Sequence, residues 1–373
     1  MKVSHTHKIC YVLPEYREGL DTHFSYIEGL LTEANKDLET FLIIEKGSYP
    51  SVNFGCKKIK VINSGNIIFR FFRFMFWMLR ARKWGARDYY VHYSYLSAFI
   101  ASIIVKVFGG RVFYWNCGET WKYQRPFFRE KFERLTYRMV TFLVTGTEHL
   151  ADEYARFYEI PRKKVKVMPN WVDTKRFKRV LDKPDLRKEL EILQDRKVVF
   201  FVHHLSFRKG SRMILPVVRD LLKVRKDFFF VIAGSGPDEE SLRSRVENTD
   251  RLASYVRIIG PVANSRIQKY FGAADIFFMP SQEEGFPRVI LEAMAAGVPM
   301  VMSDVGSVSE IVPKMMLPFI VDPNDAQGFV NALNALLSQS EGETEIMKTE
   351  LRRRAAEFET ATVAKIFVKL FNE

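Results

Sequence analysis

Two carboxylates, Glu284 and Glu292, have the types and spacing to do chemistry, because they stand eight positions apart around a predicted helix start. Gly285 and Phe286 follow Glu284, and Pro287 pre-sets the first turn of a helix whose free N–H groups favour a phosphate. Such a pair cannot act on one atom, but it can hold hydroxyls at two ends of an extended ligand with an anion between them. A nucleotide-sugar has this layout. The alternative is that both side chains are merely solvated.

Two predicted strands position this loop. Residues 276–279 form an apolar run that ends at Pro280, and residues 298–302 form another after a helix that stops at Gly297. A strand, loop, helix, strand unit has parallel strands, and its loop lies at their carboxyl ends. Ligands bind at such loops.

A second loop supplies cations. The predicted strand of residues 197–202 is followed by HHLSFRKG and then by a helix from Ser211. Arg208 and Lys209 therefore lie at the carboxyl end of a strand and ahead of a helix, where they can neutralise a leaving diphosphate. A solvated basic loop is the alternative interpretation.

The string around Glu284 and Glu292, with A-M-A-A-G after it, resembles the E-x7-E signature of the family 4 retaining glycosyltransferases of GT-B fold. The cation loop is similar to that family's G-R-L, three residues, K-G pattern: Leu205, Lys209 and Gly210 match, and His204 stands at the usual arginine. The resemblance implies an α/β fold of two doubly wound Rossmann-like domains that face a central cleft, with a C-terminal helix returning to the N-terminal domain.

The resemblance also implies a reaction, the transfer of a hexosyl group from a nucleotide-diphosphate sugar with retention. Glu284 would hold the sugar hydroxyls, Glu292 the ribose, and Lys209 with Arg208 or His204 the diphosphate. The other donor-binding positions carried over are Gly285, Phe286, Pro287, Gly19, Gly234, Gly236, Arg257 and Ile258, the last two beside the base. The family transfers without a metal, and the chain has no D-x-D sequence, so no metal or other cofactor is expected.

The acceptor side rests on weaker matches. Family members have H-x-H at one strand end and a histidine after the next, whereas this chain has His92 at the first and N-C-G-E at the second. The resemblance therefore makes His92 a catalytic candidate that faces the acceptor, with Asn116 and Glu119 as further acceptor-side candidates. A structural role at a strand end is the alternative for His92.

The chain of 373 residues is long enough for two domains. The sequence V-K-V-M-P-N-W-V-D resembles the family's interdomain hinge, so we expect an N-terminal domain at 1–169 and a donor-binding domain at 170–345. The segment 346–373 is expected to be the returning helix. Three cysteines without metal-ligand spacing favour a reducing compartment, and neither a signal peptide nor a membrane span is expected.

Basic residues concentrate in the N-terminal half. Of the formal net charge of +13, residues 1–170 carry +11, from 27 Lys and Arg against 16 Asp and Glu. This excess predicts an anionic partner. No zinc-finger, RNP or helix-turn-helix pattern is found, so a membrane surface is expected rather than nucleic acid.

Residues 67–84 carry the membrane prediction. Between Lys46 and Arg87 there are ten Lys or Arg and no Asp or Glu. If residues 67–84 are helical, one face mixes guanidinium and indole groups, and an adjacent stripe is phenylalanine. The mixed face contains Arg70, Arg73, Trp77, Arg80 and Trp84, and the stripe contains Phe69, Phe72 and Phe76. We expect this helix to lie in the headgroup region; the alternative buries the stripe against a sheet.

These predictions together describe a peripheral enzyme on the cytoplasmic face of a membrane that uses a lipid-linked or glycan acceptor. Two other functions remain open from the sequence. One is a nucleotide-sugar epimerase of GT-B fold, which needs carboxylate and histidine groups that the N-terminal half supplies thinly. The other is a membrane-associated subunit that binds nucleotide-sugar without turnover.

Overall fold

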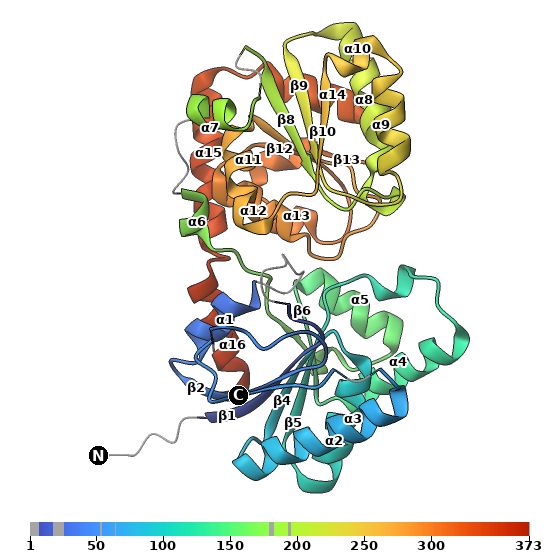
Figure 1. Cartoon of the computed structure of the whole chain (residues 1–373), viewed down its shortest axis with the longest axis vertical. Helices are drawn as coiled ribbons and strands as arrows, with labels where there is room; N and C mark the ends of the chain where they lie inside the picture. The colour runs from blue at the N-terminus through green and yellow to red at the C-terminus, as the bar shows by residue number, and fades with distance from the viewer. Residues whose placement is uncertain are drawn as a thin grey trace. The chain divides into compact units, whose positions relative to one another are not determined.

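The computed structural model describes residues 7–17, 26–52, 54–63, 65–178, 183–192 and 195–372. The chain divides into two compact units (Figure 1). Unit 1 contains Met1–Asn170 and Thr360–Glu373, and unit 2 contains Trp171–Glu359. Within the described residues each unit has one parallel sheet, of seven strands in unit 1 and six in unit 2. The predicted α/β class with two doubly wound domains is confirmed.

The sheet of unit 1 has the strand order β3-β2-β1-β4-β5-β6-β7. Its strands are β1 (His7–Leu13), β2 (Leu38–Ile44), β3 (Lys58–Val61), β4 (Asp88–His92), β5 (Arg111–Trp115), β6 (Phe142–Thr145) and β7 (Val165–Val167). Its helices are α1 (Ile27–Ala34), α2 (Ile67–Trp84), α3 (Tyr95–Phe108), α4 (Phe127–Met139), α5 (Glu148–Tyr158) and α16 (Thr360–Asn372).

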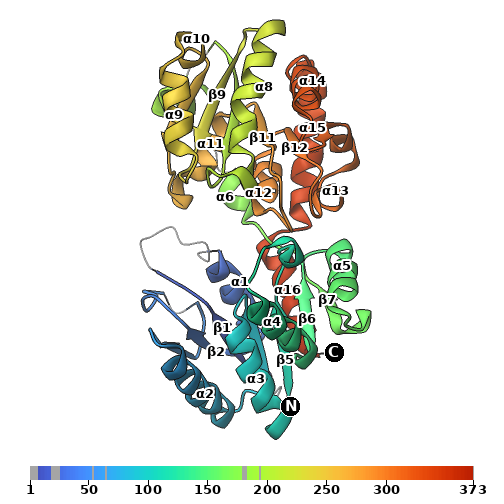
Figure 2. The same cartoon turned by 90° about the vertical axis from the view of Figure 1, so that its right-hand side faces the viewer.

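Alternating side chains bury both faces of this sheet, as the nearly continuous apolar strands require. In β1, Cys10 and Val12 join the core cluster that α2, α3, α4 and α5 cover. Tyr11 points the other way and packs against Phe367 of α16, with ring centroids 6.0 Å apart. Helices α1 and α16 cover that second face (Figure 2).

The returning segment begins at Thr360, which corrects the predicted start at residue 346. Helix α15 (Glu341–Ala356) belongs to unit 2. There Arg352 donates to the carbonyl of Ala296 (3.1 Å) and Arg354 to that of Ile311 (2.9 Å). The residues between α15 and α16 include neither proline nor glycine, so the sequence lacks a signal for this break.

Helix α16 is expected to be essential for the stability of unit 1. Phe367 is fully buried and lies 4.8 Å from Tyr90 between ring centroids. We expect Phe367→Ala to lower the free energy of unfolding by about 3–5 kcal/mol because it leaves a cavity in this face. Urea unfolding followed by fluorescence measures the change. Lys365→Ala, at an exposed position of the same helix, is the control; equal effects of the two changes would contradict the assignment.

The sheet of unit 2 has the order β10-β9-β8-β11-β12-β13. Its strands are β8 (Lys197–Val202), β9 (Phe228–Ala233), β10 (Val256–Gly260), β11 (Ile276–Met279), β12 (Met300–Ser303) and β13 (Ile320–Val321). Its helices, besides α15, are α6 (Thr174–Lys178), α7 (Lys183–Glu189), α8 (Ser211–Val224), α9 (Glu239–Glu247), α10 (Asp250–Ala253), α11 (Ile267–Ala273), α12 (Arg288–Ala296), α13 (Val308–Ile311) and α14 (Ala326–Leu337).

The helices of the described residues are too short or too polar to cross a bilayer. The longest of those named above, α2, starts at Asn66, whose side chain accepts a bond from the backbone N–H of Ile68 (2.8 Å). It stops at Gly85, where φ is 116°. Cap and stop agree with the predicted helix of residues 67–84.

Candidate functional site

Strands β8 and β11 are parallel neighbours in unit 2. The cation loop (residues 203–210) and the acidic loop (residues 280–287) therefore leave the sheet side by side, and we call them the joined loops. The backbone N–H groups of Gln282 and Glu283 donate to the carbonyl of Arg208 at 2.9 and 3.3 Å. A Cβ on Gly210 would come within 1.8 Å of the Pro280 carbonyl oxygen, so only glycine permits this approach. The fold therefore joins two loops that are 70 residues apart in the sequence.

Glu284 is the centre of the joined loops and its side chain is only 8% exposed. One of its oxygens, Oε1, accepts three bonds. Lys209 Nζ donates at 2.7 Å, Ser281 Oγ at 2.9 Å and His203 Nε2 at 3.0 Å. A carboxylate fixed through one oxygen presents the other in a defined direction, which is what recognition of a sugar hydroxyl requires.

Glu284 is ionised at neutral pH. Burial acts to raise the pKa of its carboxyl, but the bonds and charges of His203 and Lys209 outweigh burial and lower that pKa to about 2. Burial also lowers the pKa of His203, more than the neighbouring Glu284 raises it. The pair is therefore a carboxylate beside a neutral imidazole.

His203 and Ser281 are the site residues that sequence reasoning missed. The family pattern drew attention to His204, which the structure leaves exposed, whereas His203 points to Glu284. The available signal was that two histidines follow the strand, so one of them must turn toward the neighbouring loop. Ser281 was visible only as the second residue after β11.

Arg208 and Lys209 differ in their surroundings. The Lys209 side chain is 17% exposed and reaches Glu284, whereas the Arg208 side chain is 49% exposed and pairs with Glu283 (2.9 Å). Lys209 thus belongs to the interior of the joined loops and Arg208 to their rim. Both stand at the carboxyl edge of the sheet, as predicted.

The start of α12 forms the other side of the acidic loop. Pro287 is the N-cap residue of α12 and makes no side-chain capping bond. The first backbone N–H groups of α12 point back toward the acidic loop. Phe286 is buried and meets Phe358 edge to face. Ser307 N–H donates to the carbonyl of Gly285 (3.0 Å), which ties the loop to the segment after β12.

Glu292 lies on α12, half-buried. Burial raises the pKa of its carboxyl, while the charges of Arg288 and Arg176 act in the opposite direction. The structure thus places Glu284 in the loop and Glu292 on the following helix, as the spacing predicts. Their roles toward a ligand stay predictions.

The loop after β9, residues 234–237, contains two glycines and packs against the cation loop. A Cβ on Gly234 would come within 1.9 Å of the His203 carbonyl oxygen, and Gly236 follows in the same loop. Leu205 N–H donates to the Ser235 carbonyl (2.9 Å) and His203 N–H to that of Ala233 (3.2 Å). These two glycines therefore let one loop lie directly against the other.

The predicted base-side residues, Arg257 and Ile258, lie on β10 as expected. Arg257 stands near the amino end of β10, donates to the Glu191 carbonyl and lies over the Phe229 ring. The Ile258 carbonyl accepts from Arg243 (3.0 Å). These contacts lie within unit 2, and the role of both residues beside a base stays a prediction. Gly19 lies outside the described residues.

His92 presents no surface to an acceptor in this structure, which corrects the predicted orientation. The ring is fully buried at the end of β4. Its Nδ1 bonds the Tyr11 hydroxyl (3.1 Å) and its Nε2 the Tyr26 hydroxyl (3.2 Å), and the ring stacks on Trp115. These contacts agree with the alternative interpretation of His92, a structural role at the end of the strand.

The other two acceptor-side candidates are also buried. The Asn116 amide donates to the Tyr137 hydroxyl (3.1 Å) and accepts from the N–H of Gly118 (3.1 Å). Glu119 pairs with Lys122 at 2.9 Å. Asn116 thus organises the loop after β5, so its predicted role toward an acceptor is not what the structure shows.

Only some of the α2 residues that were predicted to face a membrane are exposed in the structure. Arg73 and Arg80 are exposed, but Arg70 donates to Glu45 (3.3 Å). Trp77 and Trp84 pack against the core cluster, which corrects their predicted exposure. Lysine ammonium groups cover both indoles, 4.5 Å from Trp77 and 5.0 Å from Trp84.

Apolar side chains of α2 also face outward, beside the exposed Arg73 and Arg80. Phe74, Met78 and Ala81 meet the core, so the opposite face is exposed. That face carries Phe69, Phe72, Phe76 and Leu79, and Ile67 and Ile68 are exposed at the start of the helix. The predicted stripe of Phe69, Phe72 and Phe76 is therefore exposed, and the phenylalanine of α2 that is fully buried in the core is Phe74.

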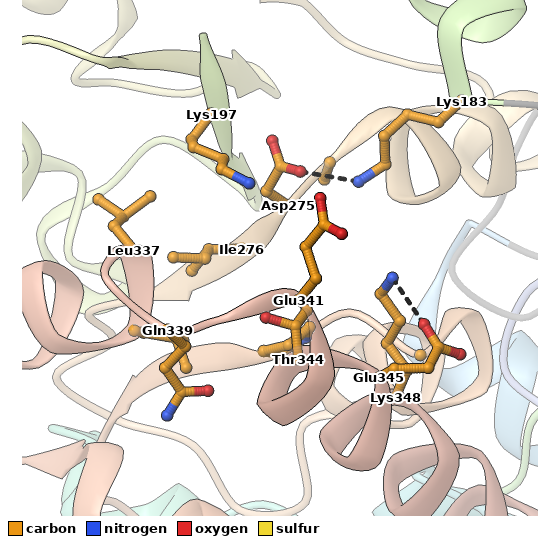
Figure 3. A pocket seen from close by; sticks show the side chains of 14 residues that line it. Lys183, Lys197, Asp275, Ile276, Leu337, Gln339, Glu341, Thr344, Glu345 and Lys348 are labelled. Carbon is orange, nitrogen blue, oxygen red and sulfur yellow. Dashed lines mark hydrogen bonds and ion pairs between the residues drawn. The ribbon is translucent and has the colours of Figure 1, made fainter.

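A cavity of about 420 Å³ lies elsewhere in unit 2, where β8 and β11 begin (Figure 3). Lys183 and Asp275 pair there at 2.8 Å, and Lys348 pairs with Glu345 at 3.0 Å. The predicted donor-binding residues do not line it. The cavity is therefore distinct from the joined loops, which lie at the other ends of the same strands.

Comparison with known proteins gives matches to both the sequence and the fold. The profile of the family described as Glycosyl transferases group 1 matches residues 182–357. The chain is 32% identical over 190 residues to the lipopolysaccharide core biosynthesis mannosyltransferase LpsB of Rhizobium meliloti, which covers 49% of this chain and 52% of that protein. It is 28% identical over 173 residues to the UDP-Gal:alpha-D-GlcNAc-diphosphoundecaprenol alpha-1,3-galactosyltransferase of Escherichia coli, which covers 46% and 44%.

These matches span about half the length of the curated relatives. The fold match is longer: a sucrose-phosphate synthase from Thermosynechococcus elongatus has a TM-score of 0.80 over 98% of both chains, at 18% identity. The predicted GT-B fold is confirmed. Residues 182–357, a little under half of the chain, thus match the glycosyl transferases group 1 family.

Proposed function

We propose that the protein is a retaining hexosyltransferase that moves a sugar from a nucleotide-diphosphate sugar to a hydroxyl or phosphate acceptor. The observation that carries this proposal is Glu284, a buried carboxylate held through one oxygen by Lys209, Ser281 and His203. The match of residues 182–357 to the group 1 family supports it.

Each part of the joined loops has a task in this proposal. Glu284 binds sugar hydroxyls and orients the anomeric carbon. Lys209 and the N–H groups at the start of α12 stabilise the charge that grows on the diphosphate as the glycosidic bond breaks. Glu292 binds the ribose. The leaving phosphate takes the proton of the acceptor on the same face of the sugar, so retention requires no dedicated base, and no metal is required.

A thermal-shift panel tests the donor proposal. The panel contains UDP-glucose, UDP-N-acetylglucosamine, GDP-mannose and ADP-glucose, the matching nucleoside diphosphates, and each ligand with and without Mg²⁺. We expect one nucleotide class to stabilise the protein equally in both conditions. Binding without any hydrolysis or transfer would instead favour a non-catalytic subunit, and the absence of any shift would contradict the proposal.

For the acceptor we propose a lipid-linked glycan or glycolipid at the membrane leaflet that faces the nucleotide-sugar pool. A similar protein, the Escherichia coli galactosyltransferase, carries a diphosphoundecaprenol acceptor in its name. The exposed stripe of Phe69, Phe72 and Phe76 on α2, with the exposed cations Arg73 and Arg80, supports attachment to an anionic bilayer.

Helix α4 adds a second apolar and basic point in unit 1. At its start Phe127 and Phe128 are exposed, Phe128 to 83%. Lys131 lies over the Phe127 ring at 4.2 Å, and Arg129 is exposed beside them. In this proposal the phenylalanines enter the headgroup layer and the cations contact lipid phosphates.

The α2 stripe gives a testable membrane prediction. Replacing Phe69, Phe72 and Phe76 together with serine is expected to lower binding to vesicles of one part phosphatidylglycerol and three parts phosphatidylcholine by about 10²-fold or more, because three apolar side chains no longer leave water. Sedimentation with the vesicles measures the loss.

A matched triple change in unit 2 is the control. Val224, Leu317 and Ile346 are also exposed, and their replacement with serine is expected to leave vesicle binding unchanged. Binding of the wild type should also fall between 0.1 and 0.5 M salt and on pure phosphatidylcholine. If the α2 triple variant still sediments like the wild type, the membrane proposal is wrong.

A further inference from the structure

His203 is the group at the joined loops to which the family pattern gives no role. It stands directly after β8, at the glycine of the family's G-R-L pattern. Its backbone is held on both sides, because its N–H donates to the Ala233 carbonyl and its own carbonyl oxygen lies against Gly234. The imidazole is thereby directed across the sheet edge to Glu284.

The hydrogen bonds of the ring determine where its proton lies. The backbone N–H of His204 donates to Nδ1 of His203 at 2.9 Å, so Nδ1 carries a lone pair. In a neutral ring the proton must then be on Nε2, and Nε2–H donates to Glu284 Oε1 at 3.0 Å. The second ring nitrogen of a histidine often sets the tautomer in this way.

We propose that His203 is a positioning residue for the sugar-binding carboxylate: it fixes Glu284 so that Oε2 faces the donor sugar. This inference rests on the proposed function. Lys209 and Ser281 bond the same oxygen, but Lys209 also reaches the Glu283 carbonyl at 3.4 Å and is needed by the diphosphate. His203 and Ser281 are the donors that can hold Glu284 while Lys209 turns to the phosphates, and His203 is the one whose ring is itself fixed by a backbone N–H.

Protonation of His203 would remove this arrangement. A second proton would sit on Nδ1 and meet the N–H of His204, so the ring would have to turn away. The charged groups that face the ring are Glu284 and Lys209, with His204 beside them. Burial lowers the pKa of His203 below its ordinary value of 6.5, so the neutral tautomer persists through neutral pH and is lost on the acid side.

The test compares two uncharged amides at position 203. The amide nitrogen of glutamine can occupy the place of Nε2, whereas that of asparagine reaches only the place of Nδ1. The probes are the nucleotide-diphosphate sugar that the thermal-shift panel selects and its nucleoside diphosphate, with affinities measured by calorimetry and kcat/KM by product release.

We expect His203→Asn to weaken sugar-nucleotide binding and kcat/KM by about tenfold or more, since a bond to a charged group is lost. His203→Gln should stay within about threefold of the wild type, and nucleoside diphosphate affinity should be unchanged in both. The wild-type kcat/KM should fall below pH 6.5 by a step that His203→Gln lacks.

Three results separate the possible failures. Equal values for the two variants would overturn the role of His203. A parallel loss of nucleoside diphosphate affinity would also overturn it, because that loss shows a disturbed loop rather than a misplaced carboxylate. If the wild type neither binds nor turns over any panel member, the proposed function itself fails, and the role of His203 falls with it.

Discussion

Replacing Glu284 with glutamine is expected to lower kcat/KM by about 10²-fold or more while the fold is retained. Glutamine keeps the shape of the side chain but removes the charge that accepts bonds from Lys209, Ser281 and His203. The variant loses charged bonds to the sugar hydroxyls and leaves the Lys209 ammonium without its partner. Initial rates of product formation over a range of donor concentrations measure the effect.

The neighbouring carboxylate provides the control for this change. Glu283 pairs with Arg208 at the rim of the loop, and Glu283→Gln is expected to stay within about threefold of the wild type because surface pairs contribute little. Circular dichroism and thermal melting confirm that both variants fold. If Glu284→Gln turned over donor as fast as Glu283→Gln, Glu284 would not be the sugar-binding residue.

Replacing Lys209 with methionine is expected to lower kcat/KM by about 10²-fold, through loss of the cation that stabilises the leaving diphosphate. Methionine keeps the apolar stem, so the loop keeps its packing. Nucleoside diphosphate affinity should fall as well, which distinguishes this variant from His203→Asn. Steady-state kinetics and calorimetry with the panel ligands measure both quantities.

Arg208 is the matched control for Lys209, since it is the adjacent residue with the same charge but lies on the rim. Arg208→Met is expected to have a clearly smaller effect than Lys209→Met. The double variant of Glu284→Gln and Lys209→Met should lose less kcat/KM than the product of the two single fold-losses, because the two residues are in direct contact. An equal effect of the two cation changes would contradict the distinction between interior and rim.

The strands that carry the site were predictable because each is a short apolar run with a clear end. Strands β8 and β11 have the predicted bounds, and the fold class and family resemblance are confirmed. The contact between Lys209 and Glu284 was not predictable, since the two residues were assigned to different parts of a ligand. Only the pairing of β8 with β11 brings them together.

Helix α2 shows a second reason why parts of the structure could not be predicted from the sequence. Its period identified correctly which residues share a face, but both faces are rich in phenylalanine, so the pattern did not identify the face that meets the sheet. Phe74 and Met78 occupy the core and Phe72 and Phe76 are outside. His92 is similar, because the tyrosines that enclose it come from β1 and from the residue before α1.

The discontinuity of unit 1 has a consequence for synthesis. Residues 1–170 leave the ribosome before unit 2, yet the sheet face that includes Tyr11 and Tyr90 is only partly covered, by α1, until residues 360–372 emerge. Unit 2 is continuous from Trp171 to Glu359, so it is complete before unit 1 is. Domains generally fold as units during translation, and here the order of completion reverses the order of the chain. Residues that are translated after unit 2 therefore complete the core of a unit whose other residues are translated before it.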